Sequence, residues 1–406
     1  MTAARENLDA LTGLRFVAAF TIVLGHTYMP WLEVTAIGMP LFFTLSGFII
    51  HYVYADEFAD GWRPASRKFA VARFSRIYPL YLALLSYSIL RGPMGPPLMT
   101  PDGLPVLLAY LTGCWTWWPY QIEGNLLLEW YYHISWSVST EIFFYFAYAA
   151  VFYRISGLRN ARSCLIILLT FCVATYAIFY VAYLTRDLWE AAILRSFPQF
   201  TARTVNFNGS FYRWLLYVSP YSRIFEFIGG CLTCQLYRLL RRETGRAGPI
   251  PTAALAWSAV AVAAILFALF RYFGEFNPWL AQGNHSFGGF IVSLHMNFLF
   301  APACYAMILA LALGGSAIGT ILSSRICCFL GDISYSTYLS HPNAERILLH
   351  TGLVVTATWA HVLVMLTIIY VVSWVLYSIV EVPAKRGLRQ LLTPRRLAVA
   401  ASGGGA

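Results

Sequence analysis

The sequence predicts an all-α, polytopic transmembrane helical bundle of about ten spans with both termini in the cytoplasm. Of the 406 residues, 59% are hydrophobic and only 11% are charged, whereas a soluble domain carries about 25% charged residues. The chain therefore lacks the polar residues to cover a water-exposed surface. Its apolar segments are about 20 residues long, which suits spanning helices and exceeds the roughly ten-residue strands of a membrane barrel.

Candidate spans follow one another along most of the chain. They are 11–30, 36–54, 77–95, 136–153, 164–184, 221–238, 250–270, 287–312, 326–346 and 357–378. No small-residue cleavage site follows the first one, so we do not expect a removable signal peptide. We expect one membrane domain over 1–390 and a short disordered cytoplasmic tail over 391–406.

The positions of the basic residues predict the orientation. The net charge is +10, and Arg and Lys cluster in 55–76, 154–163, 238–248 and the C-terminal segment from Lys385 to Arg396. Cytoplasmic loops carry such clusters. All four fall on one side only if the apolar stretch 104–118 does not cross, so we expect it in an outer or re-entrant segment. Clusters between apolar segments indicate topology signals, and no nucleic-acid partner or metal site is expected.

The first span contains two polar side chains in an apolar environment. Arg15 and His26 are eleven residues apart, which is about three helical turns, so they share one helix face about 16 Å apart. Intramembrane ionisable residues are candidates for function. We expect Arg15 near the inner membrane face and His26 near the outer one. The alternative for Arg15 is an anchor that reaches back to the cytoplasmic interface, and for His26 a purely structural hydrogen-bonding partner.

Further polar residues sit in or beside later spans. Arg73 and Arg76 lie at the cytoplasmic start of the third span, and their guanidinium groups suit either the phosphates of a donor or lipid headgroups. Glu141 is expected in the fourth span, toward its outer side. Three candidates for substrate binding follow near the outer ends of later spans: Arg223, Glu226 and His341. The first two are one turn apart and can neutralise each other.

Several blocks of the sequence, taken in order, resemble the acyltransferase-3 family of membrane acyltransferases. They are Leu8 to Arg15 with the Arg15–His26 spacing, Leu41 to Ile50, Arg73 to Pro79, Trp136 to Glu141, and Ile333 to His341. The resemblance runs from Leu8 to about Arg389. The chain departs from the family pattern at Pro40, Ile142 and Ser340. The extracellular hydrolase-like domain of some members is expected to be absent.

The resemblance implies an O-acyltransferase of the bacterial inner membrane, with acyl-CoA, acetyl-CoA in the simplest case, as a donor substrate that is not permanently bound. In this reading Arg73 and Arg76 bind the donor phosphates, Arg15 lines the route of the thioester, and His26 is the general base. Glu141 orients His26 or the sugar. The implied acceptor is a hydroxyl of a polysaccharide or oligosaccharide at the outer side.

Two other functions stay open at this point. A transporter or flippase of a lipid-linked glycan would use the same polar residues to line a solute path, although transporters often have repeated halves with helices broken at corresponding positions. Members of another large family of membrane acyltransferases use a His with an upstream Asn or Asp, but His295 and Asn297 are too close together to match that pattern. The sequence leaves the oligomeric state open.

Overall fold

The fold is a bundle of α-helices, seen in a computed structural model that describes residues 2–26, 34–91, 103–122, 125–127, 131–243, 251–277, 286–350 and 359–392. The helices of its first half are α1 (Thr2–His26), α2 (Thr35–Asp60), α3 (Trp62–Arg91), α4 (Gly103–Thr112), α5 (Trp136–Ala150), α6 (Ala161–Leu184) and α7 (Arg186–Ser196). Those of its second half are α8 (Phe211–Arg213), α9 (Pro220–Glu243), α10 (Thr252–Arg271), α12 (Phe287–Leu294), α13 (Ala301–Leu313), α14 (Ala317–Leu322), α15 (Arg325–Asp332), α16 (Ser334–His350), α17 (Trp359–Leu376) and α18 (Val382–Leu392). The strands in the described part are β1 (Gln121–Ile122) and β2 (Asn125–Leu126), paired antiparallel.

Five helices are long and apolar enough to cross a membrane on length and composition. These are Leu8–His26, Thr35–Asp60, Ala161–Leu184, Thr252–Glu275 and Val362–Leu392. A sixth span is obtained if Phe287–Leu294 and Phe298–Leu313 are taken together. The chain is thus a membrane protein of helical type. The described part of each predicted segment is mostly helical, but four of the ten (77–95, 136–153, 221–238 and 326–346) do not pass this test within the described residues, so the number ten stays a prediction.

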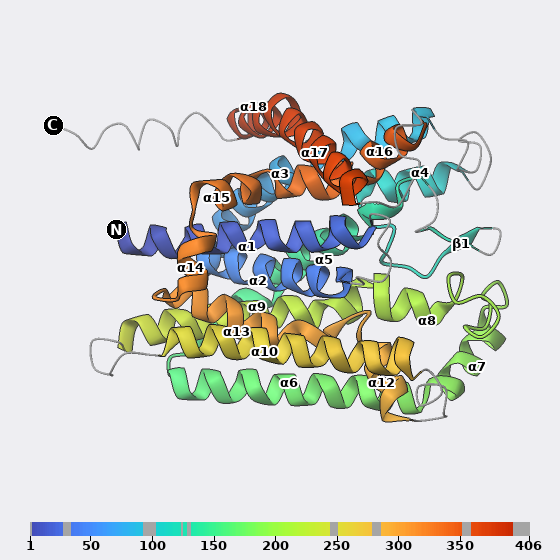
Figure 1. Ribbon diagram of the computed structural model, residues 1–406, viewed down its shortest axis with the longest axis horizontal. Coiled ribbons are helices and arrows are strands. Elements are labelled where there is room, and N and C mark those ends of the chain that lie inside the picture. Colours follow the sequence, from blue (N-terminus) through green and yellow to red (C-terminus); the bar gives the residue numbers. More distant parts are fainter. Residues whose placement is uncertain are drawn as a thin grey trace.

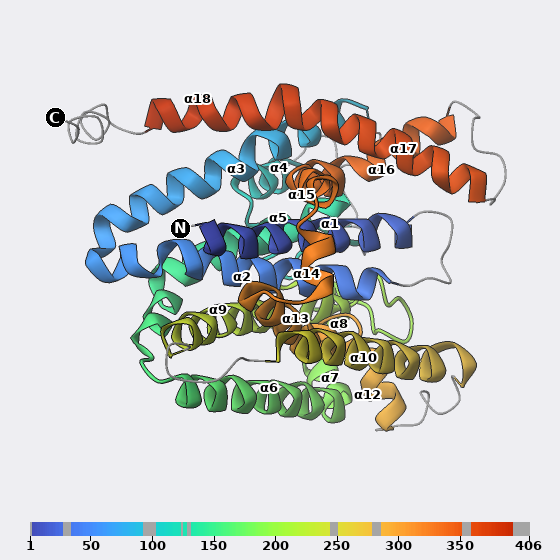
Figure 2. The same cartoon turned by 60° about the vertical axis from the view of Figure 1, so that its left-hand side comes forward.

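The basic segments gather at one end of the bundle. Helix α1 begins there and α18 ends there, together with the C-terminal end of α9, whereas α4, β1, α7 and α8 lie at the opposite end (Figure 1). The α2–α3 corner lies at the same end as the start of α1 (Figure 2). Helix α4 has ten residues, or about 15 Å, half of the hydrocarbon thickness. Its length agrees with the expectation that 104–118 does not cross. We call the basic end the inner end and the other the outer end.

Two of the predicted spans are interrupted. The expected helix 287–312 bends by 94° between α12 and α13, where His295, Met296 and Asn297 leave the helix. The expected helix 326–346 is divided at Ile333 into α15 and α16. Helix α18 continues to Leu392, which is two residues into the expected tail. Residues 393–406 lie outside the described structure, so the tail stays a prediction.

Helices α1, α2 and α9 form the centre of the bundle, with α3, α17 and α18 on one side and α6 and α10 on the other (Figure 1). Small residues let α2 and α9 touch. A Cβ on Gly47 would lie 2.1 Å from the Phe227 carbonyl oxygen, and one on Gly230 would lie 2.2 Å from that of Thr44. Glycine at both positions is required for this approach, which is how helices pack closely in membranes.

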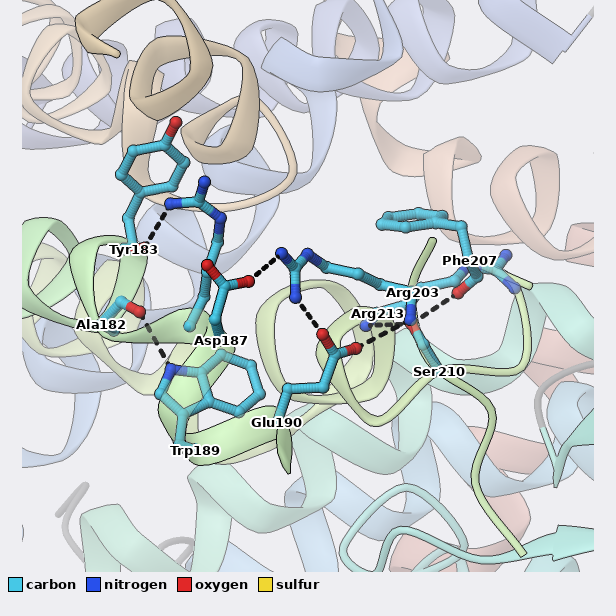
Figure 3. Close-up of polar contacts among 10 residues, drawn as sticks. Ala182, Tyr183, Asp187, Trp189, Glu190, Arg203, Phe207, Ser210 and Arg213 are labelled. Atoms are coloured by element: carbon cyan, nitrogen blue, oxygen red, sulfur yellow. Dashed lines mark hydrogen bonds and ion pairs between the residues drawn. The ribbon is translucent and has the colours of Figure 1, made fainter. Parts of the chain in front are cut away.

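Part of the outer end is held by ion pairs in addition to aromatic packing. The guanidinium of Arg203 pairs with Asp187 and Glu190 of α7 (Figure 3), and its backbone N–H donates to Glu190 Oε1 at 2.7 Å. Burial lowers the pKa of Arg203, but Asp187 and Glu190 outweigh it and the pKa lies above its ordinary value. This cluster fixes the segment between α7 and α8, which contributes Phe207 and Asn208 to the cavity described next.

Candidate active site

Two cavities lie inside the bundle, one on each side of a shared pair of residues. The inner cavity has a volume of about 300 Å³ and is lined by α1, α2, α3, α5 and α16. Four ionisable side chains line it: Arg15, Arg73, Arg76 and Glu141. The fold therefore brings together residues from three helices that the sequence separates by up to 126 positions, and three of the four carry a positive charge.

The guanidinium of Arg73 is held by aromatic rings. It lies over the rings of Tyr54 (5.0 Å), Phe69 (5.8 Å) and Tyr145 (6.0 Å), and the side chain is only 8% exposed. Cation–π contacts of this kind suit Arg. They hold the face of the planar guanidinium group and leave the N–H donors in its plane able to form hydrogen bonds. Such burial leaves a lipid headgroup little access to Arg73.

The positive charges of the inner cavity are not balanced by ion pairs. Among the ion pairs of the described residues, none involves Arg15, Arg73 or Arg76. The carboxylate that lines the cavity with them is that of Glu141. A cavity with three guanidinium groups and one carboxylate has a net positive charge and attracts anions.

Glu141 is tied into the inner cavity by two hydroxyl groups. Ser46 Oγ donates to Glu141 Oε1 at 2.9 Å, and Tyr145 Oη donates to the same oxygen at 2.8 Å. The sequence suggested a place toward the outer side and a contact with His26. The structure instead places Glu141 beside the three Arg residues, and it does not line the cavity that contains His26.

The outer cavity has a volume of about 400 Å³ and contains His26. Its other polar lining residues include Thr35, His133, Asn208, Arg213, Tyr217, Arg223, His295 and Tyr338. They come from α1, α2, α8, α9, α16 and the segments beside them. Several hydrogen-bonding side chains thus converge on a space large enough for a sugar unit.

His26 is the last residue of α1, and its side chain is exposed. Its Nδ1 lies 2.9 Å from the carbonyl oxygen of Ile22. In the neutral ring Nδ1 must carry the proton to make this hydrogen bond, because a carbonyl only accepts. Nε2 then has a free lone pair and can take a proton from a hydroxyl group.

The structure places His341 beside His26, a neighbour that spacing along the chain does not reveal. The two ring centroids are 5.1 Å apart. His341 is 1% exposed, its Nδ1 lies 2.7 Å from the Tyr338 carbonyl oxygen, and its Nε2 has no hydrogen-bond partner. A buried polar nitrogen without a partner is costly, so His341 combines burial with an unused hydrogen-bonding position next to the candidate base.

Arg223 and Glu226 form a buried ion pair. Arg223 Nη1 lies 3.0 Å from Glu226 Oε1, with both side chains at most 1% exposed. Arg223 Nε also donates to the Tyr217 carbonyl oxygen at 2.9 Å. Only Arg223 lines the outer cavity. Glu226 thus balances the charge of Arg223 but does not itself line the outer cavity.

Met39 and Tyr338 line both cavities. They mark the place where the inner, Arg-lined space meets the outer, His-lined space. Arg15 lines the first and His26 the second, so the two ends of the Arg15–His26 face open into different cavities. Together the two cavities trace a line from the inner toward the outer end of the bundle.

Sequence reasoning missed several of the lining residues. His133 comes from a short 3₁₀ turn, and His295 lies at the break between α12 and α13. The sequence does contain a signal for His295, because His295 and Asn297 are polar residues within an apolar segment. A helix in lipid breaks only where other groups replace its hydrogen bonds, and polar side chains can do so. Met39 gave no signal, since an apolar residue in an apolar span is expected.

The sequence of the chain is similar to those of known proteins. A family model described as an acyltransferase domain matches residues 8–378. "Peptidoglycan O-acetyltransferase OatA" of Listeria monocytogenes serovar 1/2a (strain ATCC BAA-679 / EGD-e) is 24% identical over 94 residues, which are 22% of this chain and 15% of that protein. "Protein 2 in picA locus" of Rhizobium radiobacter is 36% identical over 84 residues, 20% of this chain and 44% of that protein.

The similarity to these two relatives is confined to part of each protein, less than half of their own length. No solved structure matches the chain. The family model, by contrast, covers nearly the whole chain and every ionisable residue that lines the inner cavity. The chain therefore belongs to the acyltransferase-3 family.

Proposed function

We propose that this protein is an integral membrane O-acyltransferase. It moves an acyl group, acetyl in the simplest case, from cytoplasmic acyl-CoA to a hydroxyl of a glycan at the outer side of the membrane. The observation that carries the proposal is the meeting of the two cavities at Met39 and Tyr338, with unpaired guanidinium groups on one side and His26 on the other. Family membership and the similarity to a protein named an O-acetyltransferase support it.

The inner cavity is the donor site in this proposal. Coenzyme A carries several phosphates, and guanidinium groups bind phosphate with paired, charge-assisted hydrogen bonds. Arg73 and Arg76 hold the phosphates, and Arg15 lines the route of the thioester. Glu141 acts as a positioning residue here, because it holds the hydroxyls of Ser46 and Tyr145 at the cavity wall.

The outer cavity is the acceptor site, and the reaction takes place where the two cavities meet. His26 Nε2 takes the proton of the acceptor hydroxyl as the hydroxyl oxygen attacks the carbonyl carbon of the thioester. A C–O bond forms and the C–S bond breaks. Coenzyme A leaves as the thiolate and takes up the proton from His26. A positioned base of this kind supplies about 10²–10⁴-fold of rate.

Arg223 and His341 serve the acceptor side in this proposal. Arg223 lines the outer cavity and is held in place by Glu226 and the Tyr217 carbonyl. His341 lies next to His26 and has an unused Nε2. It is a positioning residue for His26 or for the acceptor hydroxyl. The donor must reach the inner end, so both termini face the cytoplasm, in a bacterial inner membrane.

The test is acyl transfer by the full chain in membranes that lack its own background activity. His26→Ala is expected to lower transfer of radiolabel from acetyl-CoA into the glycan fraction by at least about 100-fold. Binding of the fluorescent analogue ethenocoenzyme A should be unchanged, because His26 does not line the inner cavity. If the His26→Ala protein still transfers the radiolabel, His26 is not the general base.

A transporter or flippase of a lipid-linked glycan is the second candidate, favoured by one observation. The 94° bend between α12 and α13 places broken helix ends beside the outer cavity, and transporters bind substrates at such breaks. The same purified protein separates the two functions. A transporter would leave acetyl-CoA intact in the presence of glycan, whereas the acyltransferase releases coenzyme A thiol.

A further inference from the structure

The passage between the two cavities has one fixed wall. Tyr338 Oη donates to the Ile134 carbonyl oxygen at 2.9 Å and accepts from Ser137 Oγ at 2.8 Å. Its ring meets that of Phe42 edge-on, with centroids 5.9 Å apart. Two hydrogen bonds at its tip and packing along its ring hold Tyr338 in one position, so its side of the passage does not change width.

Met39 is the other residue that lines both cavities. Met39 has no strong hydrogen-bonding group and is 6% exposed. Its unbranched thioether has three rotatable side-chain bonds before the terminal methyl and adapts to irregular spaces. The side chain can therefore change position without breaking a strong polar contact.

The backbone that carries Met39 is, in contrast, held against α1. At the preceding residue, Gly38, a Cβ would lie 2.4 Å from a side-chain carbon of Ile22 and 2.9 Å from the Ala18 carbonyl oxygen. The helix is this close to α1 because Gly38 has no side chain. The position of the Met39 Cα is thus fixed, and the width of the passage depends on the side chain at 39.

We propose that Met39 determines which acyl chains this protein transfers. The proposal rests on the function proposed above. The carbonyl carbon of the donor must lie at the Met39–Tyr338 passage, because the phosphates are held on the inner side and His26 lies on the outer side. The acyl chain then lies against the Met39 side chain. The length of the side chain at position 39 determines the longest acyl chain that can be accommodated there while the C–S bond breaks and the C–O bond forms.

The experiment compares acetyl-CoA with butyryl-CoA as labelled donors for the full chain in membranes, with radiolabel in the glycan fraction as the readout. Met39→Ala is expected to raise the butyryl-to-acetyl ratio of transfer by at least about tenfold, since each methylene accommodated in an apolar pocket changes transfer about 10–200-fold. Met39→Phe is expected to lower the ratio. Ethenocoenzyme A binding should stay unchanged in both, because the phosphate-binding residues are untouched.

Met365→Ala is the matched control. Met365 is also a buried methionine, 1% exposed, but it packs with Val23, Ala344 and Ile369 and lines neither of the two cavities. It reports the effect of losing buried volume alone, and its ratio should equal that of the wild type. If Met39→Ala unfolds, Met39→Phe still tests the direction of the change.

The outcomes separate the two levels of the proposal. One outcome is that the wild type transfers acetyl and that Met39→Phe and Met39→Ala have the same butyryl-to-acetyl ratio as the wild type. This outcome would overturn the role of Met39 and leave the acyltransferase function standing. Wild-type protein that transfers neither label and does not bind ethenocoenzyme A would overturn the function itself. A ratio that rises equally in Met365→Ala would also overturn the role of Met39.

Discussion

Single residues in this protein differ in whether another side chain balances their charge. Arg223 is balanced by Glu226 at 3.0 Å. Arg203 is balanced by Asp187 and Glu190. Arg73 instead faces three aromatic rings. Removing one partner of a buried ion pair costs about 3–5 kcal/mol, so Glu226 matters for stability, whereas Arg73 stays available to an anion.

The first prediction at the residue scale concerns donor binding. Arg73→Gln should raise the Kd of ethenocoenzyme A by at least about tenfold, because a hydrogen bond to a charged group contributes about 1.5–3 kcal/mol. Arg73→Lys should raise it also, since a lysine keeps the charge but loses the planar fork and the stacking. The measurement is fluorescence anisotropy of the purified full chain.

The control for this prediction removes the same charge elsewhere. Arg159 is an exposed residue between α5 and α6 and lines neither cavity. Arg159→Gln should leave the Kd within about a factor of two, which is within about ±0.5 kcal/mol for an exposed site. Equal weakening by both substitutions would mean that the net charge of the inner end, rather than the cavity, attracts the donor.

At the scale of helices, the contact between α2 and α9 fixes the relative positions of residues that line the two cavities. Helix α2 contributes Met39 and Ser46, and α9 contributes Arg223. Gly47 and Gly230 bring the two backbones together. A change in their separation would move the wall between the two cavities as well as the helices themselves.

Gly47→Ala is therefore expected to destabilise the protein by about 1–3 kcal/mol or more, because the new methyl group would overlap the Phe227 carbonyl. Acyl transfer should fall with it. Gly157→Ala is the control, since nothing lies within 4 Å of a Cβ at that position. Thermal unfolding in detergent, followed by tryptophan fluorescence, measures both. A Gly47→Ala protein as stable as Gly157→Ala would contradict the close contact.

The sequence predicted the type of these helices better than their interruptions. Apolar segments of spanning length identify α1, α2, α6, α10 and α17 directly, because burial in lipid acts on each segment by itself. The break after α12 and the division at Ile333 depend on neighbouring helices, which a single segment does not encode. For the same reason Glu141 was assigned to the side of His26, although it lines the cavity of Arg15.

For the whole molecule, the arrangement of the inner and outer ends is the feature on which the proposed direction of transfer depends. The Arg-lined cavity lies toward the end that carries the basic segments, as the positive-inside rule predicts for a cytoplasmic donor. Charge distribution along the chain was enough to predict this polarity. The two separate cavities were not predictable, because their walls are made of side chains from helices far apart in the sequence.

Epitope tags inserted at two exposed positions test this orientation. A tag at Gly157, at the inner end, should be protected from protease in intact spheroplasts, and a tag at Val205, which is 81% exposed, should be cleaved. The measurement is immunoblotting before and after membrane disruption, with acyl transfer checked to show that each tagged protein is native. Cleavage at Gly157 in intact spheroplasts would reverse the orientation.

The unpaired guanidinium groups of the inner cavity have a consequence for the resting state of the protein. Three like charges near one another repel. Among the described residues Glu141 lines that cavity with them, and Glu381 lies close enough to Arg15 and Arg76 to interact with their charges. In the proposed function a polyanionic donor completes the electrostatics of this cavity, and at a donor concentration of 100 times its Kd its binding would add about 2.7 kcal/mol of stability. If the donor is a coenzyme A thioester, we expect the amount of intact protein in the membrane to follow the supply of these thioesters in the cell.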